Sequence, residues 1–228
     1  MAFASQLRTI TDLRSPDGYL EALLNTGRED SSYLALVTHP HPPSGGTMHN
    51  KVVYHAMKAF THFGVPVLRF NFRGTGLSEG VHDEGRKEVD DVRAAVDWLS
   101  HEFMKPILFC GFSFGSNVGL RATCGDPRVA GLIGLGLPVR AAGRDYTYEF
   151  LAGCNQPKLF LSGDEDIFCP EVILDRILAA APAPCERIII PGADHFFQGV
   201  PESPLPKLGQ MQHHIRVWLA AQFGLIEV

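Results

Sequence analysis

Long apolar runs are missing from this chain of 228 residues. No stretch approaches the roughly 20 apolar residues that a helix needs to span a bilayer. Residues 1–8 combine neither a basic start nor a long apolar core, so no export signal is visible. Dense basic runs are also missing, and 20 Lys and Arg against 25 Asp and Glu give a net charge of −5. The charge argues against nucleic acid or an anionic membrane as a partner, and we expect a cytoplasmic protein.

The cysteines lack the pattern of a disulfide framework or a metal site. The five cysteines are an odd number and show no Cys-x-x-Cys spacing. Cys110 falls in a predicted core strand, where a reduced and buried thiol is the expected state. The composition, with 45% apolar and 20% charged residues, is ordinary for a folded protein. The length fits one domain, 1–228, with a substantial core.

Strand-like and helix-like patterns alternate along the chain, which predicts an α/β protein with a mostly parallel sheet and helices on both faces. A turn signal at Pro16-Asp17-Gly18 predicts an N-terminal hairpin of residues 7–14 and 19–26. Short apolar runs predict the buried strands 33–38, 65–70, 106–110, 129–137, 157–163 and 186–190. Helices are predicted where apolar residues recur at helical spacing or where a segment follows a predicted strand. These helices are 50–63, 86–103, 116–123, 170–181 and 206–223.

A G-x-S-x-G segment lies where the strand 106–110 should turn into a helix. It reads Gly111-Phe112-Ser113-Phe114-Gly115. The pattern by itself is weak, because three fixed positions recur by chance. In a strand–turn–helix context it predicts a strained, left-handed serine whose hydroxyl lies exposed beside a helix N-terminus, with glycines where side chains would collide.

Four other segments follow predicted strands and carry polar residues. The loop 38–50 reads T-H-P-H-P-P-S-G-G-T-M-H-N, and the loop 71–80 reads N-F-R-G-T-G-L-S-E-G. After the last two strands come D-E-D-I-F-C-P at 164–170 and P-G-A-D-H-F-F at 191–197. Polar loops at the ends of parallel strands meet at one edge of the sheet, where ligands bind in such folds.

In this order, the segments resemble the motifs of the α/β-hydrolase superfamily across most of the chain. The loop 71–80 is similar to the N-x-R-G-x-G-x-S turn of that superfamily. The loop 38–50 resembles the oxyanion loop of small, cap-less members with H-P-H-P and G-G-T-M. Only residues 138–156 separate two strands where many relatives insert a lid. The resemblance therefore implies the α/β-hydrolase fold with no lid domain and a shallow, open site.

The resemblance also implies a catalytic triad in the order serine, acid, histidine. Ser113 is the expected nucleophile, since a serine hydroxyl needs a neighbouring base to become reactive. A serine that merely caps a helix would not explain the flanking glycines. His195 is the expected base because its Gly-Ala-Asp-His-Phe loop follows the strand after which this fold delivers it. The alternative is a surface-loop histidine.

The triad acid is less sharply defined, because three acidic residues are adjacent at 164–166. Family members typically carry the acid three residues after a strand-ending glycine and four before a proline. Gly163 and Pro170 lie at these distances from Asp166, which favours it as the acid, and Asp164 remains the alternative. Asp194, next to the base, is expected to hydrogen-bond its own loop instead.

Two backbone N–H groups should hold the oxyanion that develops during acyl transfer. One is expected at Phe114, directly after the nucleophile. The second should come from the loop 38–50, in which Pro40, Pro42 and Pro43 have no N–H. Elimination and the resemblance to an H-G-x loop favour His41, with a proline at the position of the usual glycine.

Several other residues have two readings. His39, His41 and His49 could supply metal ligands, but the loop has no carboxylate or thiol to complete a set, so no metal is expected. Arg73 with its neighbouring glycines could bind phosphate, but no lysine follows, and structural hydrogen bonds fit better. The aromatic residues at 146, 148 and 150 could form a pocket wall, and core packing is the favoured reading.

The resemblance implies a carboxylesterase-like serine hydrolase that cleaves a small ester or thioester through an acyl-enzyme on Ser113, without a cofactor. Lactonase, peptidase and perhydrolase reactions, or a non-catalytic binding protein, stay open because the fold does not fix the reaction. The substrate depends on a pocket shaped by loops such as 138–156 and 199–206. The sequence leaves open whether the protein forms a homo-oligomer.

Overall fold

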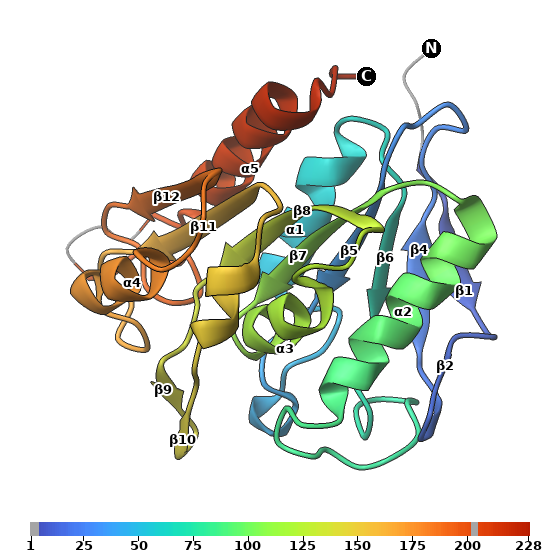
Figure 1. The fold of residues 1–228 in the computed structure, drawn as a ribbon, viewed down its shortest axis with the longest axis horizontal. Helices are drawn as coiled ribbons and strands as arrows, with labels where there is room; N and C mark the ends of the chain where they lie inside the picture. The colour runs from blue at the N-terminus through green and yellow to red at the C-terminus, as the bar shows by residue number, and fades with distance from the viewer. Residues whose placement is uncertain (1–4, 202–204) are drawn as a thin grey trace.

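An eight-stranded sheet runs through the centre of the protein (Figure 1). The computed structural model describes residues 5–201 and 205–228. In spatial order the strands are β1 (Leu7–Ile10), β4 (Ala22–Asn25), β6 (Val67–Phe70), β5 (Leu34–Thr38), β7 (Ile107–Phe112), β8 (Val129–Leu135), β11 (Lys158–Gly163) and β12 (Cys185–Ile190). Only the β1–β4 and β4–β6 pairs of this sheet are antiparallel. The prediction of a mostly parallel sheet is therefore confirmed.

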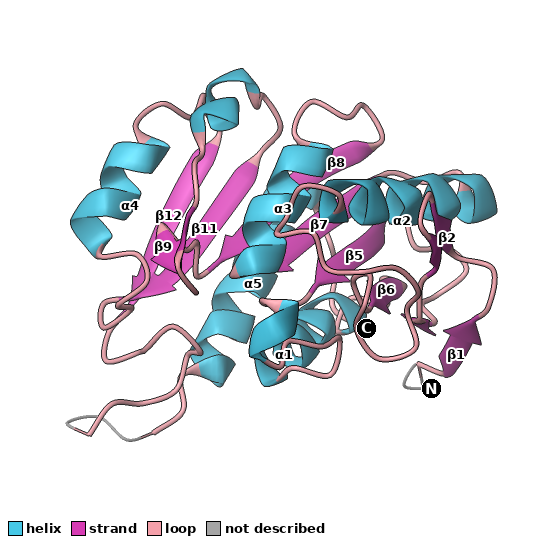
Figure 2. Ribbon diagram, turned by 90° about the horizontal axis from the view of Figure 1, so that it is seen from below, coloured by secondary structure: helices cyan, strands magenta, loops and turns pink. Residues whose placement is uncertain are grey.

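Helices cover both faces of the sheet (Figure 2). Helices α1 (Lys51–Thr61) and α5 (Leu208–Phe223) pack on one face. Helices α2 (Glu88–Phe103), α3 (Phe114–Thr123) and α4 (Glu171–Leu178) pack on the other. Because the central strands are buried on both sides, they consist of continuous apolar runs, and each helix buries one apolar stripe.

The predicted N-terminal hairpin forms, but in two parts. Strands β1 and β4 pair within the main sheet, whereas β2 (Arg14–Ser15) and β3 (Gly18–Tyr19) form a small sheet of their own. Between the two parts, Leu13 and Leu20 turn into the core and are fully buried. Burial of these two leucines interrupts the ladder that the sequence pattern suggested.

Residues 136–157 hold a short hairpin and one 3-10 helix in place of a lid. The hairpin strands are β9 (Arg140–Ala141) and β10 (Arg144–Asp145), and the 3-10 helix is Glu149–Gly153. Tyr146 and Tyr148 are buried in the core, where Tyr148 Oη donates to Pro138 O at 2.8 Å, and Phe150 packs against them half-buried. The favoured reading of these aromatic residues as core packing is confirmed.

The loop between β6 and α2 is fixed by a buried ion pair. Arg73 donates from Nη2 to Asp91 Oδ1 at 2.6 Å, and the Arg73 backbone N–H donates to Asp91 Oδ2 at 3.0 Å. Both side chains are buried, and Asp17 also contacts the guanidinium. Gly74 and Gly76 have φ of 70° and 58°, as a tight turn requires. Arg73 therefore makes the structural hydrogen bonds that the sequence favoured.

Among the residues described, no helix has the length and apolar character needed to cross a bilayer.

Candidate active site

The backbone of Ser113 is held in a strained conformation between β7 and α3. Its φ of 54° and ψ of −121° lie in a region that L-amino acids rarely adopt. A Cβ on Gly111 would lie 2.6 Å from the Gly115 carbonyl oxygen, and a Cβ on Gly115 would lie 2.4 Å from the His39 carbonyl oxygen. Strand β7 and helix α3 thus pass too close for a side chain at Gly111, as the G-x-S-x-G pattern predicted, and α3 passes too close to the end of β5 for one at Gly115.

Ser113, His195 and Asp166 form one chain of hydrogen bonds. Ser113 Oγ lies 2.9 Å from His195 Nε2, and His195 Nδ1 lies 2.8 Å from Asp166 Oδ2. An ionised Asp166 can only accept, so Nδ1 carries the hydrogen and Nε2 accepts from the serine hydroxyl. The three residues are 7%, 5% and 3% exposed. The structure therefore brings together three side chains that are far apart in the sequence.

The Asp166 carboxylate is fixed by two further donors. Oδ1 accepts from the Phe168 backbone N–H at 2.9 Å, and Oδ2 accepts from Ser162 Oγ at 3.2 Å. The alternative acid, Asp164, is exposed and accepts from the Gly192 N–H at 2.7 Å. Geometry therefore places Asp166, and not Asp164, against the histidine.

Asp194 serves its own loop, as expected. Its Oδ1 accepts from the backbone N–H groups of Phe196 and Gln198 at 2.9 and 2.8 Å. At the base of the same loop, a Cβ on Gly163 would lie 1.8 Å from the Ala193 carbonyl oxygen. Close passage of β11 beneath the loop and the Asp194 bonds together hold His195 at the site.

Within the described residues, the loop after β5 leaves the backbone N–H of His41 without an acceptor. Residues Pro42–Ser44 form a 3-10 turn in which the N–H groups of Ser44 and Gly46 donate to His41 O, and that of Gly45 donates to Pro42 O. In residues 5–201 and 205–228, no acceptor engages the N–H of His41 or of Phe114, the first residue of α3. Both expected oxyanion donors are therefore uncommitted.

His39 braces this loop from the core. It is fully buried, its Nδ1 lies 2.7 Å from Pro40 O, and its Nε2 accepts from the Phe72 N–H at 3.0 Å. Both bonds require the neutral ring with hydrogen on Nδ1, and burial lowers its pKa to about 3. Pro40 O shares a planar peptide group with the His41 N–H. Holding one end of that plane fixes the direction of the other.

The His41 side chain contacts Ser44 and two aromatic rings. Its Nδ1 lies 2.8 Å from Ser44 Oγ, and its ring lies edge-on against His82 and Phe114. Burial, followed by the charges of His82 and Arg144, lowers its pKa. Within the part of the chain that the structure describes, no three His, Cys, Asp or Glu side chains converge as a metal site.

A cavity of about 120 Å³ opens beside Ser113 and His195. Its other lining residues are Pro40, His41, Ser44, Gly45, Gly46, Asn50, Ala141, Ala142, Phe168 and Phe196. The segment 138–156 contributes to this wall, as predicted, but through Ala141 and Ala142 at the hairpin tip. Of the other predicted loop, 199–206, residues 202–204 lie outside the described part of the chain.

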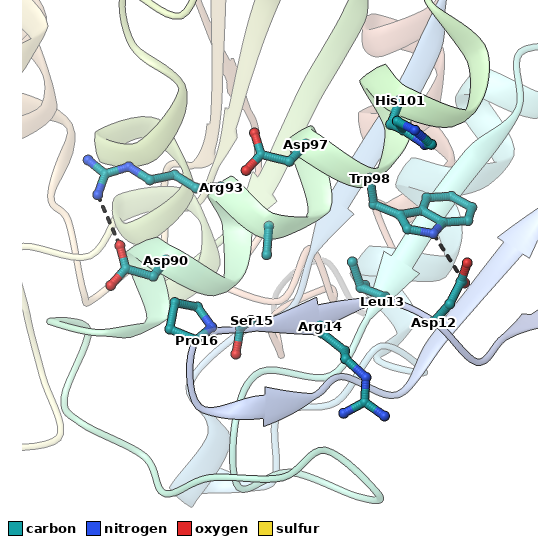
Figure 3. Close-up of a pocket in the computed structure, with 11 residues that line it drawn as sticks. Asp12, Leu13, Arg14, Ser15, Pro16, Asp90, Arg93, Asp97, Trp98 and His101 are labelled. Atoms are coloured by element: carbon teal, nitrogen blue, oxygen red, sulfur yellow. Dashed lines mark hydrogen bonds and ion pairs between the residues drawn. The ribbon is translucent and has the colours of Figure 1, made fainter.

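A second hollow, of about 690 Å³, lies between α2 and the segment around β2 (Figure 3). Its polar side chains partly satisfy one another: Trp98 Nε1 donates to Asp12 at 3.1 Å, and Arg93 pairs with Asp90 at 3.0 Å. Ser113, His195 and Asp166 do not line it. Its volume exceeds that of the cavity beside Ser113.

The fold and this constellation define a class of protein. Residues 35–221 match the family model described as an alpha/beta hydrolase domain. The chain therefore belongs to the α/β-hydrolase superfamily, as its motifs suggested.

Three of the relatives cover between 80% and 96% of the chain. An uncharacterized protein of Rickettsia prowazekii is 36% identical over 190 residues, covering 80% of this chain and 79% of that protein. An alpha-beta serine hydrolase homologue from Coxiella burnetii is 31% identical with a TM-score of 0.80, covering 96% of this chain and 100% of that one. A serine hydrolase without lid from Xanthomonas campestris is 29% identical with a TM-score of 0.79, covering 96% of each chain.

Sequence reasoning missed several residues around the site. The ring of Phe168 lies 4.5 Å from that of His195, and Phe112 and Phe196 approach the same imidazole at 5.2 and 5.3 Å. Ser162 supports Asp166, and Asn50 reaches the cavity. The signals in the sequence were proximity alone: Phe112 and Phe196 are direct neighbours of Ser113 and His195, and Phe168 follows Asp166 by two residues.

We expect His39 to make stability depend on pH. Because the folded state holds this histidine neutral while the unfolded chain protonates it near pH 6.5, the stabilisation is present above that pH and is lost as pH falls. Between pH 7.5 and 5.5 its contribution should decline by about 1.4 kcal/mol. Urea unfolding of the wild type and His39→Gln at both pH values measures this. Equal losses in the two proteins would contradict the assignment.

Proposed function

We propose that this protein is a serine hydrolase that cleaves a small carboxylic ester or thioester through an acyl-enzyme on Ser113. The observation that carries the proposal is the buried chain of hydrogen bonds from Ser113 Oγ through His195 to Asp166. The serine hydrolase homologue from Coxiella burnetii and the lid-less serine hydrolase from Xanthomonas campestris support the same class of activity.

In the first step, Ser113 Oγ attacks the acyl carbon while His195 Nε2 takes its proton. The carbonyl oxygen becomes an oxyanion that accepts hydrogen bonds from the N–H groups of Phe114 and His41. His195 then returns the proton to the departing alcohol or thiol, which leaves the acyl group on Ser113. Asp166 keeps the imidazole oriented and stabilises its protonated form.

In the second step, water attacks the acyl-enzyme. His195 removes a proton from the water, and the acid departs as the same proton is returned to Ser113 Oγ. Every proton in the cycle moves through one imidazole nitrogen, Nε2. The mechanism uses no cofactor and no metal.

The size of the cavity favours small substrates and bears on the alternative functions. Its volume of about 120 Å³ lies below the roughly 300–1,000 Å³ typical of sites for drug-sized ligands. Lactonase and perhydrolase reactions use the same acyl-enzyme chemistry and stay as alternatives. A peptidase has a less favourable fit to so small a cavity, and a non-catalytic binding protein has no need of an aligned triad.

Replacement of the nucleophile tests the proposal. The Ser113→Ala variant should lose at least about a thousandfold in kcat for p-nitrophenyl acetate, because no oxygen remains to form the acyl-enzyme. A fluorophosphonate should label the wild type and not the variant. Undiminished hydrolysis by Ser113→Ala, or equal labelling of both proteins, would refute the proposed nucleophile.

The acid is tested by a matched pair of substitutions. Asp166→Asn should lower kcat by about 10³- to 10⁴-fold, since an amide no longer orients the imidazole or stabilises its protonated form. Asp164→Asn, the same change two residues earlier, should leave kcat within about threefold because Asp164 bonds only to a loop N–H. Steady-state kinetics measures kcat for both variants. A larger loss of kcat in Asp164→Asn than in Asp166→Asn would make Asp164 the triad acid.

A further inference from the structure

Among the residues that the structure describes, the amide nitrogen of one side chain that lines the catalytic cavity has no hydrogen-bond partner. Asn50 lines the cavity and caps the N-terminus of α1. Its Oδ1 accepts from the Val52 N–H at 2.9 Å, its own N–H donates to Thr47 O at 3.0 Å, and its carbonyl accepts from the Tyr54 N–H at 2.9 Å. In the described ranges 5–201 and 205–228, the Nδ2 hydrogens of Asn50 have no acceptor.

The cap determines which end of the amide is available. Because Oδ1 is turned toward the first helical N–H groups, Nδ2 is the end that faces away from the helix. The amide cannot rotate to present its oxygen without leaving the Val52 N–H unpaired. Asn50 lines the cavity, and Nδ2 is the end of its amide that is left for a ligand.

The other polar side chains of the cavity are joined by two hydrogen bonds, and His41 Nε2 is their one ring nitrogen without a partner among the described residues. His41 bonds to Ser44, and Ser113 bonds to His195. The remaining lining residues are proline, glycine, alanine and phenylalanine. Such a wall binds apolar groups, and a donor set within it discriminates in favour of a substrate that carries an acceptor there.

The charge of the cavity lining limits which kind of acceptor atom a substrate can place there. No Lys, Arg, Asp or Glu is among the lining residues of this cavity in the described chain. Burying a carboxylate or phosphate there would cost its solvation without a compensating cation. A neutral ether, hydroxyl or carbonyl oxygen needs only a hydrogen bond from the amide.

We infer that Asn50 Nδ2 binds an uncharged oxygen of the substrate, so that the preferred substrate is a small neutral ester or thioester with a second oxygen near the scissile carbonyl. This inference rests on the proposed function. Asn50 lies in the same loop, 38–50, as the His41 N–H that is proposed to hold the oxyanion. One loop thus positions two oxygen atoms of the substrate relative to Ser113.

Pairs of substrates that differ by one oxygen test the inference. On the acyl side, p-nitrophenyl methoxyacetate is compared with p-nitrophenyl butyrate, whose acyl chain has CH2 in place of the ether oxygen. On the alcohol side, 2-methoxyethyl butyrate is compared with butyl butyrate. The measured quantity is the ratio of kcat/KM within each pair, which cancels any general loss of active protein.

The variants are Asn50→Asp and Asn50→Ser, because both residues still cap a helix but neither places an NH2 group at the Nδ2 position. In one of the two pairs the ratio should fall by roughly 3- to 10-fold in both variants. Asn155→Asp makes the same change of charge at an exposed position outside the cavity and should leave both ratios unchanged.

Ratios within about twofold of wild type in both pairs would overturn the role of Asn50. The proposed function is read separately, from hydrolysis of the butyrate esters by the wild type and its dependence on Ser113. Hydrolysis that depends on Ser113 with unchanged ratios would thus refute Asn50 alone. Absence of any hydrolysis dependent on Ser113 would refute both.

Discussion

The left-handed backbone of Ser113 is the constraint on which the rest of the site depends. A residue in this region costs about 1–3 kcal/mol relative to an ordinary conformation. The surroundings impose it: the Ser113 N–H donates to Leu135 O at 2.9 Å, and glycines on either side let α3 start directly above β7. A relaxed backbone would turn the hydroxyl away from His195 and move the first N–H of α3.

The carboxyl edge of the sheet collects the other groups, and each loop there is stiffened in a different way. Prolines and the neutral His39 hold the loop after β5, and hydrogen bonds to Asp194 hold the loop of His195. His39 and His195 thus need opposite behaviour toward protons. Full burial keeps His39 neutral and structural, whereas the proposed role of His195 needs a ring that gains and loses a proton.

Much of this could be predicted from sequence because it depends on local pattern. Apolar runs predicted the strands, helical spacing predicted most helices, and the resemblance to the α/β-hydrolase superfamily favoured Asp166 over Asp164 through its flanking glycine and proline. The glycines at 111 and 115 predicted a close passage of strand and helix. These features are set by neighbours along the chain, which a sequence displays directly.

The remainder depends on the direction of side chains after folding. The sequence predicts a helix that starts at Asn50, and only the tertiary arrangement brings this residue to the wall of the cavity. The sequence allowed Tyr148 to face either the pocket or the core, and the hydrogen bond from its hydroxyl to the Pro138 carbonyl exists only in the folded core. The N-terminal hairpin divides because Leu13 and Leu20 reach a core built from distant elements, a competition that no local turn signal encodes.

The central claim is that attack by the strained Ser113 creates an oxyanion that accepts hydrogen bonds from two backbone N–H groups. A crystal structure of the protein after reaction with a small fluorophosphonate tests this claim most directly. We expect phosphorus bonded to Ser113 Oγ and its unesterified oxygen within about 2.7–3.1 Å of the nitrogens of both His41 and Phe114. Attachment to another residue, or an oxygen directed into solvent away from these nitrogens, would contradict the account.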